Sequence, residues 1–198
     1  MKKFELTTEF ITNAFGKKLF RIKALVEFGD VKAGELGGYV EKEGNVSQAD
    51  NAWVSGDARV SGDARVYGDA WVSGNAWVSG NAWVSGNARV YGNARVSGDA
   101  EVSGNAWVSG NARVSGNARV SGDADYALVQ GFGTEFRCTT FYRGKNKKIM
   151  VNCGCFHGDL EGFRKQVKET RNGKIAKEYL MIADLMEYHF TSEDSSNE

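Results

Sequence analysis

The chain has 198 residues, with 25 basic and 25 acidic side chains and therefore no formal net charge at pH 7. This balance argues against a broad nucleic-acid footprint, and no stretch is long and apolar enough to span a membrane. The first residues lack the apolar run of a signal peptide, and three cysteines, an odd number, favour a reducing compartment over a disulfide framework. We therefore expect a cytoplasmic protein with no membrane partner.

Residues 1–50 are predicted to form an N-terminal cap and a first, imperfect coil. Residues 20–26 have the apolar alternation of a strand, and residues 34–40 read as a glycine-rich turn that leads into a second strand. The coils that follow would otherwise end in unpaired strand edges and an exposed apolar core. Covering that end is the role that we expect for this segment.

Residues 51–125 repeat one six-residue phrase, Asn/Asp-Ala-x-Val-Ser/Tyr-Gly, twelve times. In an extended segment Ala and Val share one face, while the residue between them, Trp or Arg in all but one phrase, points outward. Gly followed by Asn or Asp supplies a corner, because these residues tolerate positive φ best. Such short strands cannot form hairpins, so the phrase predicts a three-sided parallel solenoid with 18 residues per coil and about four regular coils.

The spacing of the valines also predicts where the regular coils begin. Val40 and Val46 are six residues apart, but Val46 and Val54 are eight apart, which indicates a two-residue bulge before the regular phrase. Within the coils, residues 18 apart should stack, so that Trp53 lies beside Trp71. The same alignment never places Asp on Asp at the corners and allows ladders of Asn on Asn.

The phrase Val-Ser-Gly-Asn-Ala-Arg resembles the hexapeptide repeat of left-handed parallel β-helix proteins, which has an aliphatic residue first and a small residue fifth. At the second place this chain has Ser or Tyr, where that family usually has Gly, Ala, Glu or Asp. The resemblance implies a left-handed coil and a homotrimer with parallel axes. It also implies a comparison with acyltransferases, many of which use a His between subunits as the base.

Residues 126–190 are predicted to form a small α+β domain, a β-hairpin with two helices. Residues 134–142 and 149–156 have strand-like composition and flank a polar turn. Asp159 can cap a first helix, and Asn172-Gly173 separates it from a second. The apolar stripes consist of Leu160, Phe163 and Val167 on the first helix, and of Ile175, Tyr179, Ile182, Leu185 or Met186, and His189 on the second. Residues 191–198 are polar and acidic, which predicts a disordered tail.

The segment Val-Asn-Cys-Gly-Cys-Phe-His-Gly-Asp-Leu and the earlier Gly-Glu-Leu-Gly-Gly-Tyr-Val resemble uncharacterised phage and prophage proteins that carry a small domain beside hexapeptide-like repeats. The resemblance implies a phage-encoded protein that acts in the host cytoplasm. It supplies no activity.

Cys153, Cys155 and His157 alternate, so on one continuous strand they would share a face. With Cys138 or His189 they form a weak candidate metal site, because thiolate and imidazole suit zinc but a single intervening residue strains the chelate. The favoured interpretation is that the thiols are buried and pack the hairpin against the helices. A cysteine nucleophile is the third reading, and it would need a further group, which the sequence does not identify, to orient Cys155 and His157.

The outward Trp and Arg rows have two interpretations: stacking that stabilises the coils and an oligomer interface, or a ligand groove. The most apolar row is the candidate oligomer interface: Trp53, Trp71 and Trp107. Arg can pair with phosphate or carboxylate and Trp can stack on planar rings. The candidate ligand-binding residues are Arg59, Arg65, Trp77, Trp83, Arg95, Arg113 and Arg119, together with Tyr67 and Tyr91, which interrupt the Ser rows.

The coils contain no His, because the only two are His157 and His189. Without a general base beside the coils, the sequence favours a non-enzymatic protein with no cofactor. We expect a homotrimer that captures a small anionic ligand, such as a signalling nucleotide, in grooves between subunits. One alternative is a structural or virion-associated spacer. The other is an acyltransferase, which would need His157 to reach the coils.

Overall fold

The computed structural model describes residues 2–191, and the tail predicted at 191–198 lies outside that range except for Thr191, the last residue of a helix. The chain divides into two compact units, Met1–Asp123 and Ala124–Glu198. The expected cap and the repeat therefore belong to one unit.

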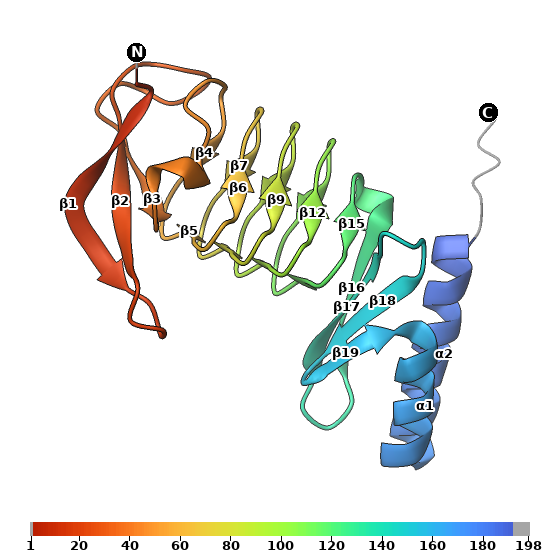
Figure 1. Ribbon diagram of the computed structural model, residues 1–198. Helices are drawn as coiled ribbons and strands as arrows, with labels where there is room; N and C mark the ends of the chain where they lie inside the picture. Colours follow the sequence, from red (N-terminus) through yellow and green to blue (C-terminus); the bar gives the residue numbers. More distant parts are fainter. Residues whose placement is uncertain (1, 192–198) are drawn as a thin grey trace, which may run out of the picture. The chain divides into compact units, whose positions relative to one another are not determined.

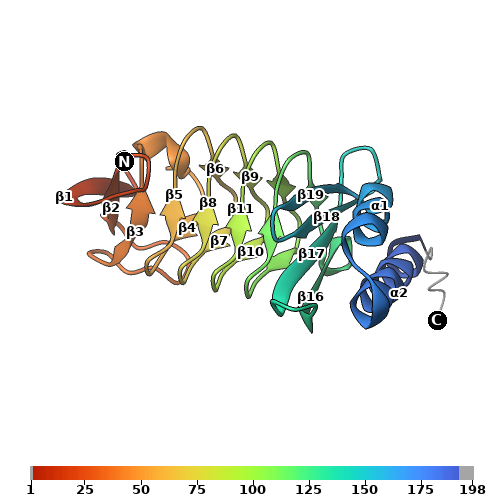
Figure 2. The same cartoon turned by 90° about the horizontal axis from the view of Figure 1, so that it is seen from below.

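The first unit is a parallel β-solenoid, and its three N-terminal strands extend one of the three faces as antiparallel neighbours (Figures 1 and 2). Strands β1 (Phe4–Thr12), β2 (Lys18–Ala24) and β3 (Leu36–Val40) pair in sequence order, and a 3-10 turn follows at Glu43–Asn45. The coils consist of two-residue strands: β4 (Trp53–Val54), β5 (Arg59–Val60), β6 (Arg65–Val66), β7 (Trp71–Val72), β8 (Trp77–Val78), β9 (Trp83–Val84), β10 (Arg89–Val90), β11 (Arg95–Val96), β12 (Glu101–Val102), β13 (Trp107–Val108), β14 (Arg113–Val114) and β15 (Arg119–Val120).

The predicted register of 18 residues per coil is confirmed. Trp53 pairs with Trp71 and Val54 with Val72, and the same offset recurs on all three faces. Every Val and every Ala of the repeat is buried, as the inward orientation of these side chains requires. Their burial, worth about 1.5–3 kcal/mol for each Val, is the main source of stability of the coils.

The corners depend on glycine and on side-chain ladders. Gly98 has φ +71°, and a Cβ there would lie 2.8 Å from the backbone nitrogen of Gly116 in the next coil. At the corners Asn81 donates to Asp99 at 2.9 Å, and Asn93 donates to Asn111 at 3.3 Å. The ladders therefore form at the positions that the 18-residue alignment predicts.

The first coil is irregular in the way the valine spacing indicated. Val46 pairs with Val66, 20 residues later, whereas Val54 pairs with Val72 at the regular offset of 18. The two extra residues therefore lie between Val46 and Val54. Asn45 replaces the missing backbone bond with its side chain, which donates to the carbonyls of Gly62 at 3.1 Å and Ala64 at 2.8 Å.

A buried lysine fastens the bulge to the cap. Lys3 Nζ donates to the carbonyls of Asp50 at 2.6 Å and Ala52 at 2.8 Å, and lies 4.6 Å from the centroid of the Phe28 ring. Burial lowers the pKa of Lys3 to about 8, although the Asp50 carboxylate opposes this shift. Strand β1 begins directly after Lys3 and pairs with β2. This strand was not predicted from the sequence.

The second unit is an antiparallel sheet with two helices. Strands β16 (Tyr126–Phe132), β17 (Arg137–Arg143), β18 (Ile149–Cys153) and β19 (Phe156–Asp159) pair in sequence order. The predicted hairpin is β17 and β18, whereas β16 was not foreseen. Helix α1 (Leu160–Thr170) begins at the predicted cap, where Asp159 accepts from the Gly162 nitrogen at 2.9 Å, and α2 (Gly173–Thr191) follows.

The core of the second unit lies between the sheet and both helices. Phe141 and Val151 of the sheet belong to one buried cluster with Phe163 of α1 and Tyr179 of α2. Phe163 packs edge-on against Phe141 and Tyr179, at centroid distances of 6.0 and 5.9 Å. The predicted stripe on α2 is confirmed at Tyr179, Ile182 and Met186, whereas Leu185 is 58% exposed. It is wrong at His189, which is exposed, because the neighbouring Phe190 is buried instead.

Candidate functional site

A surface hollow of about 410 Å³ on the coils is lined by Arg65, Tyr67 and Trp83, with Gly44 and Ser47 at its margin. The Tyr67 and Trp83 rings meet edge to face, with centroids 6.2 Å apart and planes at 80°. Trp83 is 46% exposed. The hollow thus offers two aromatic walls beside an exposed guanidinium.

A second hollow, of about 430 Å³, has Arg89, Tyr91 and Trp107 at the equivalent places, and Asp30, Trp71 and Ser73 complete its lining. The Tyr91 and Trp107 rings also meet edge to face, 6.3 Å apart at 83°. The Arg89 guanidinium lies 5.8 Å from the centroid of the Trp107 ring. We call these two sites the aromatic notches; the first is Arg65, Tyr67 and Trp83, and the second is Arg89, Tyr91 and Trp107.

The notches form because Tyr replaces Ser at two places in the repeat. In the ordinary phrase the indole leans over the corner of the preceding coil: Trp71 Nε1 donates to Ser55 Oγ at 2.9 Å, and Trp77 Nε1 donates to Ser61 Oγ at 3.2 Å. Trp83 and Trp107 have a Tyr at that place, so each indole packs against a phenol ring. At these two places a phenol ring therefore stands where Ser accepts the indole hydrogen bond elsewhere.

The structure brings together only some of the predicted ligand-binding residues. Arg65, Tyr67 and Trp83 meet in the first notch, and Tyr91 belongs to the second. Arg89 was missed, although the tetrapeptide Arg-Val-Tyr-Gly occurs at both notches and would have identified it. The remaining predicted residues lie outside the notches: Arg59, Trp77, Arg95 and Arg113 along one face, and Arg119, whose Nη2 is 3.2 Å from Glu101 Oε2.

The predicted interface of Trp53, Trp71 and Trp107 needs a correction. Trp53 is fully buried, with Phe4 and Phe28 edge-on to its indole at 6.2 and 5.4 Å. It is therefore inaccessible to another subunit. Trp71 is half-buried and Trp107 is 49% exposed, and both line the second notch.

The predicted sharing of a face by Cys153, Cys155 and His157 is wrong. Cys153 ends β18, and Gly154, with φ +62°, turns the chain through Cys155 into β19. His157 pairs with Asn152 across this hairpin, and its Nε2 lies 3.2 Å from the Tyr142 hydroxyl. Within residues 2–191 no group of His, Cys, Asp or Glu has the arrangement of a metal site.

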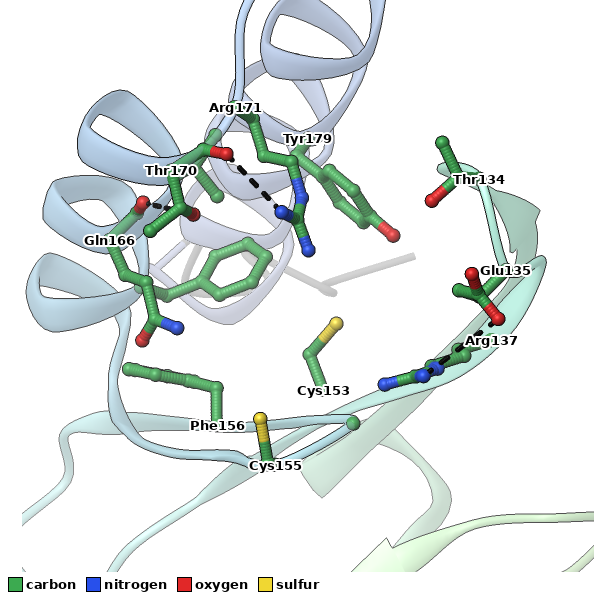
Figure 3. A pocket seen from close by; sticks show the side chains of 13 residues that line it. Thr134, Glu135, Arg137, Cys153, Cys155, Phe156, Gln166, Thr170, Arg171 and Tyr179 are labelled. Atoms are coloured by element: carbon green, nitrogen blue, oxygen red, sulfur yellow. Dashed lines mark hydrogen bonds and ion pairs between the residues drawn. The ribbon is translucent and has the colours of Figure 1, made fainter.

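The second unit contains a cavity of about 340 Å³ between the hairpin turn, α1 and α2 (Figure 3). Its apolar part is formed by Phe156, Phe163 and Val167. Cys153 and Cys155 border it on the sheet side, and Thr139 Oγ1 donates to Cys153 Sγ at 3.1 Å. The sequence offered no signal for this cavity, because its lining comes from four separate segments.

Two arginines flank the cavity. Arg171, directly after α1, donates to the Thr170 carbonyl at 3.2 Å, and Arg137 makes a long ion pair, 3.8 Å, with Glu135. The Tyr179 hydroxyl donates to the Phe132 carbonyl at 3.2 Å. Burial raises the pKa of Tyr179 and the Cys153 thiol adds to the rise, whereas Arg171 and Arg137 act in the opposite direction.

Comparison with known protein families identifies the coils. The pattern of the YdcK beta solenoid repeat matches residues 52–68, 58–74, 70–86, 82–98, 88–104, 94–110 and 112–124. No curated protein matches the chain in sequence. No helix in the described part of the chain is long and apolar enough to cross a bilayer. With the 18-residue register, these matches show that the chain is a β-solenoid repeat protein.

Proposed function

We propose that this protein is a non-enzymatic binding protein whose coils capture a planar anionic ligand of the nucleotide type on the aromatic notches. The observation that carries the proposal is the repetition of one constellation. Arg, Tyr and Trp occupy equivalent places in both notches, with nearly equal ring distances of 6.2 and 6.3 Å. Stacking that merely stabilises the coils would not need a Tyr, because Ser already anchors the indole elsewhere.

The chemistry of a notch fits a ligand that has a flat ring and a negative charge. Exposed indole and phenol faces stack on planar rings, at about 0.5–1.5 kcal/mol for each aromatic pair. A guanidinium pairs with phosphate through two parallel hydrogen bonds. The described residues that line the two hollows include neither His nor Cys, which supports binding without catalysis.

We further propose, following the resemblance to trimeric hexapeptide proteins, that three phage-encoded copies associate in the host cytoplasm through the face that carries Trp71 and Trp107. A ligand in the second notch would then lie between subunits. Sedimentation of the purified protein tests the association: a single species of three chains supports it, and a monomer at micromolar concentration contradicts it.

Calorimetric titration with AMP and cyclic AMP, alongside adenosine and inorganic phosphate, tests ligand binding. The decisive variant is Tyr67→Ser with Tyr91→Ser, because it restores the ordinary phrase at both places and leaves the coil intact. We expect nucleotide binding to be lost in this double variant. We expect it to be retained in Trp77→Ala, which removes an indole outside the notches. Absence of heat with every nucleotide, or equal affinity in the double variant, would contradict the proposal and favour a structural spacer.

A further inference from the structure

The cavity of the second unit has the composition of a ligand site, and the proposed function of the coils does not use it. Its lining combines an aromatic wall, Phe156 and Phe163, with two guanidinium groups. In Figure 3 the Arg171 side chain extends over the cavity toward Tyr179, and the Arg137 side chain approaches from the opposite side.

Hydrogen-bond donors converge on the same space. Thr134 brings a hydroxyl and Gln166 brings a side-chain amide from α1, whereas the Thr170 hydroxyl already donates to the Gln166 carbonyl at 2.7 Å. Among the described residues of the lining the one carboxylate is Glu135, which is 66% exposed, and its oxygen lies 3.8 Å from the Arg137 guanidinium. The lining therefore carries two positive charges against one negative, and all three charged groups are open to solvent.

The backbone at the two arginines is anchored by the fold around it. Arg137 begins β17 next to the Gly154 turn, where a Cβ on Gly154 would come within 2.7 Å of Arg137 Nη1. Arg171 is the C-cap of α1, and its backbone nitrogen donates to the Val167 carbonyl at 2.9 Å. Both guanidiniums are thus carried by anchored backbone, which lowers the entropy cost of placing them around one anion.

We propose that this cavity binds a small organic anion, a phosphate or carboxylate on a flat apolar body. The anionic group lies between Arg137 and Arg171, and the body packs against Phe156 and Phe163. A volume of about 340 Å³ is at the lower end of the range for small-molecule sites, which suits a single ring with one charged group.

The labelling rates of the cysteines can report whether an anion occupies the cavity. Cys153 and Cys155 border the cavity, whereas Cys138 lies on β17 outside its lining. The intact protein is labelled with a thiol reagent, and the rate at each cysteine is followed by peptide mass. Phenyl phosphate and benzoate are the anionic probes, and benzyl alcohol is their neutral counterpart.

We expect phenyl phosphate or benzoate to slow labelling of Cys153 and Cys155 and to leave Cys138 unchanged. Arg171→Ala and Arg137→Ala should each weaken this protection by about tenfold or more, since a charge-assisted hydrogen bond is lost. Arg171→Lys keeps the charge and should fall between wild type and Arg171→Ala. Lys165→Ala, which removes an exposed cation of α1 outside the lining, should leave the protection unchanged.

Equal protection by benzyl alcohol, no protection by either anion at millimolar concentration, or full protection in both alanine variants would overturn the proposal. The test is independent of the aromatic notches. The variant Tyr67→Ser with Tyr91→Ser should show wild-type protection of Cys153 and Cys155, so failure of one site leaves the other intact.

Discussion

The coils and the C-terminal unit differ in whether the residues that stabilise the fold also line a hollow. In the coils Ala and Val point to the axis, whereas Trp, Arg and Tyr point outward, so the stabilising residues and the notch residues are separate sets. In the C-terminal unit Phe163, Val167 and Tyr179 belong to the core and also line the cavity. The coils can therefore change their surface at little cost, whereas the C-terminal unit cannot.

The largest effect should come from a charge at the axis of the coils. Val84 is fully buried and stacks between Val66 and Val102, so an Asp there would be an unpaired buried carboxylate. We expect Val84→Asp to lower the free energy of unfolding by about 3–5 kcal/mol. The control is Asn111→Asp, which adds the same group at a corner and keeps an oxygen for Asn93. Urea unfolding followed by circular dichroism compares the two; equal losses would contradict the inward orientation of Val84.

Removing one aromatic side chain from each unit tests most directly whether stabilising and binding residues are separate in the coils and shared in the C-terminal unit. Tyr179 is 9% exposed and packs against Phe163, so Tyr179→Ala should cost about 3 kcal/mol or more and also weaken anion binding in the cavity. Trp83 is 46% exposed, so Trp83→Ala should cost about 1 kcal/mol or less and still reduce binding in the first notch. Urea titrations and calorimetry on both variants measure the two effects. If Trp83→Ala destabilised the protein as much as Tyr179→Ala, the separation of roles in the coils would be wrong.

Two glycines with the same backbone conformation distinguish conformational strain from crowding between coils. Gly98 has φ +71° and Gly110 has φ +64°, but only Gly98 has a neighbouring coil within contact of an added Cβ. Gly110→Ala should cost about 1–2 kcal/mol through φ alone. Gly98→Ala should cost about 1–2 kcal/mol more, because its methyl group meets the backbone of Gly116. Thermal unfolding of both variants gives the difference, and no difference would show that the corners are not tightly stacked.

The smallest effect concerns pH and the cap. Lys3 has a pKa of about 8 in the folded protein and 10.5 in its unperturbed form, so between these values the unfolded chain holds the proton more tightly. Lys3 therefore makes stability rise as the pH increases from about 8 toward 10. Lys3→Met should remove this rise, and at pH 7 it should cost about 1–2 kcal/mol because the carbonyls of Asp50 and Ala52 lose their donor. Urea unfolding at pH 7.5 and 9.5 measures both effects, with the exposed Lys2→Met as the control; a rise that persists in Lys3→Met would exclude Lys3 as its source.

The solenoid was predictable because each six-residue phrase contains the same inward-facing Ala and Val and the same corner. The valine spacing sufficed for the register, for the buried Val72 and for the bulge between Val46 and Val54. The burial of Trp53 was not predictable, since it depends on Phe4 and Phe28, which reach it only through the long-range pairing of the cap.

The C-terminal unit was predictable only where local signals are strong. The Asp159 cap and the apolar face of α1 follow from short-range patterns. The turn at Gly154 was hidden within an apolar run that reads as one strand, so His157 was assigned to the wrong face. Arg137 and Arg171 are 34 positions apart, and no spacing rule links them across a cavity.

The coils have two different periods, and they respond differently to insertions. The interior repeats every six residues, because each phrase contributes the same Ala and Val. The surface repeats only after 18, because that is the offset between stacked neighbours. Gain or loss of one phrase would leave the axis filled while moving every later Trp, Arg and Tyr to the adjoining side. Gain or loss of a full turn of 18 residues would lengthen or shorten the solenoid and preserve its surface rows. Insertions and deletions of whole phrases can therefore change the surface of the coils during evolution while the packing of the interior stays the same.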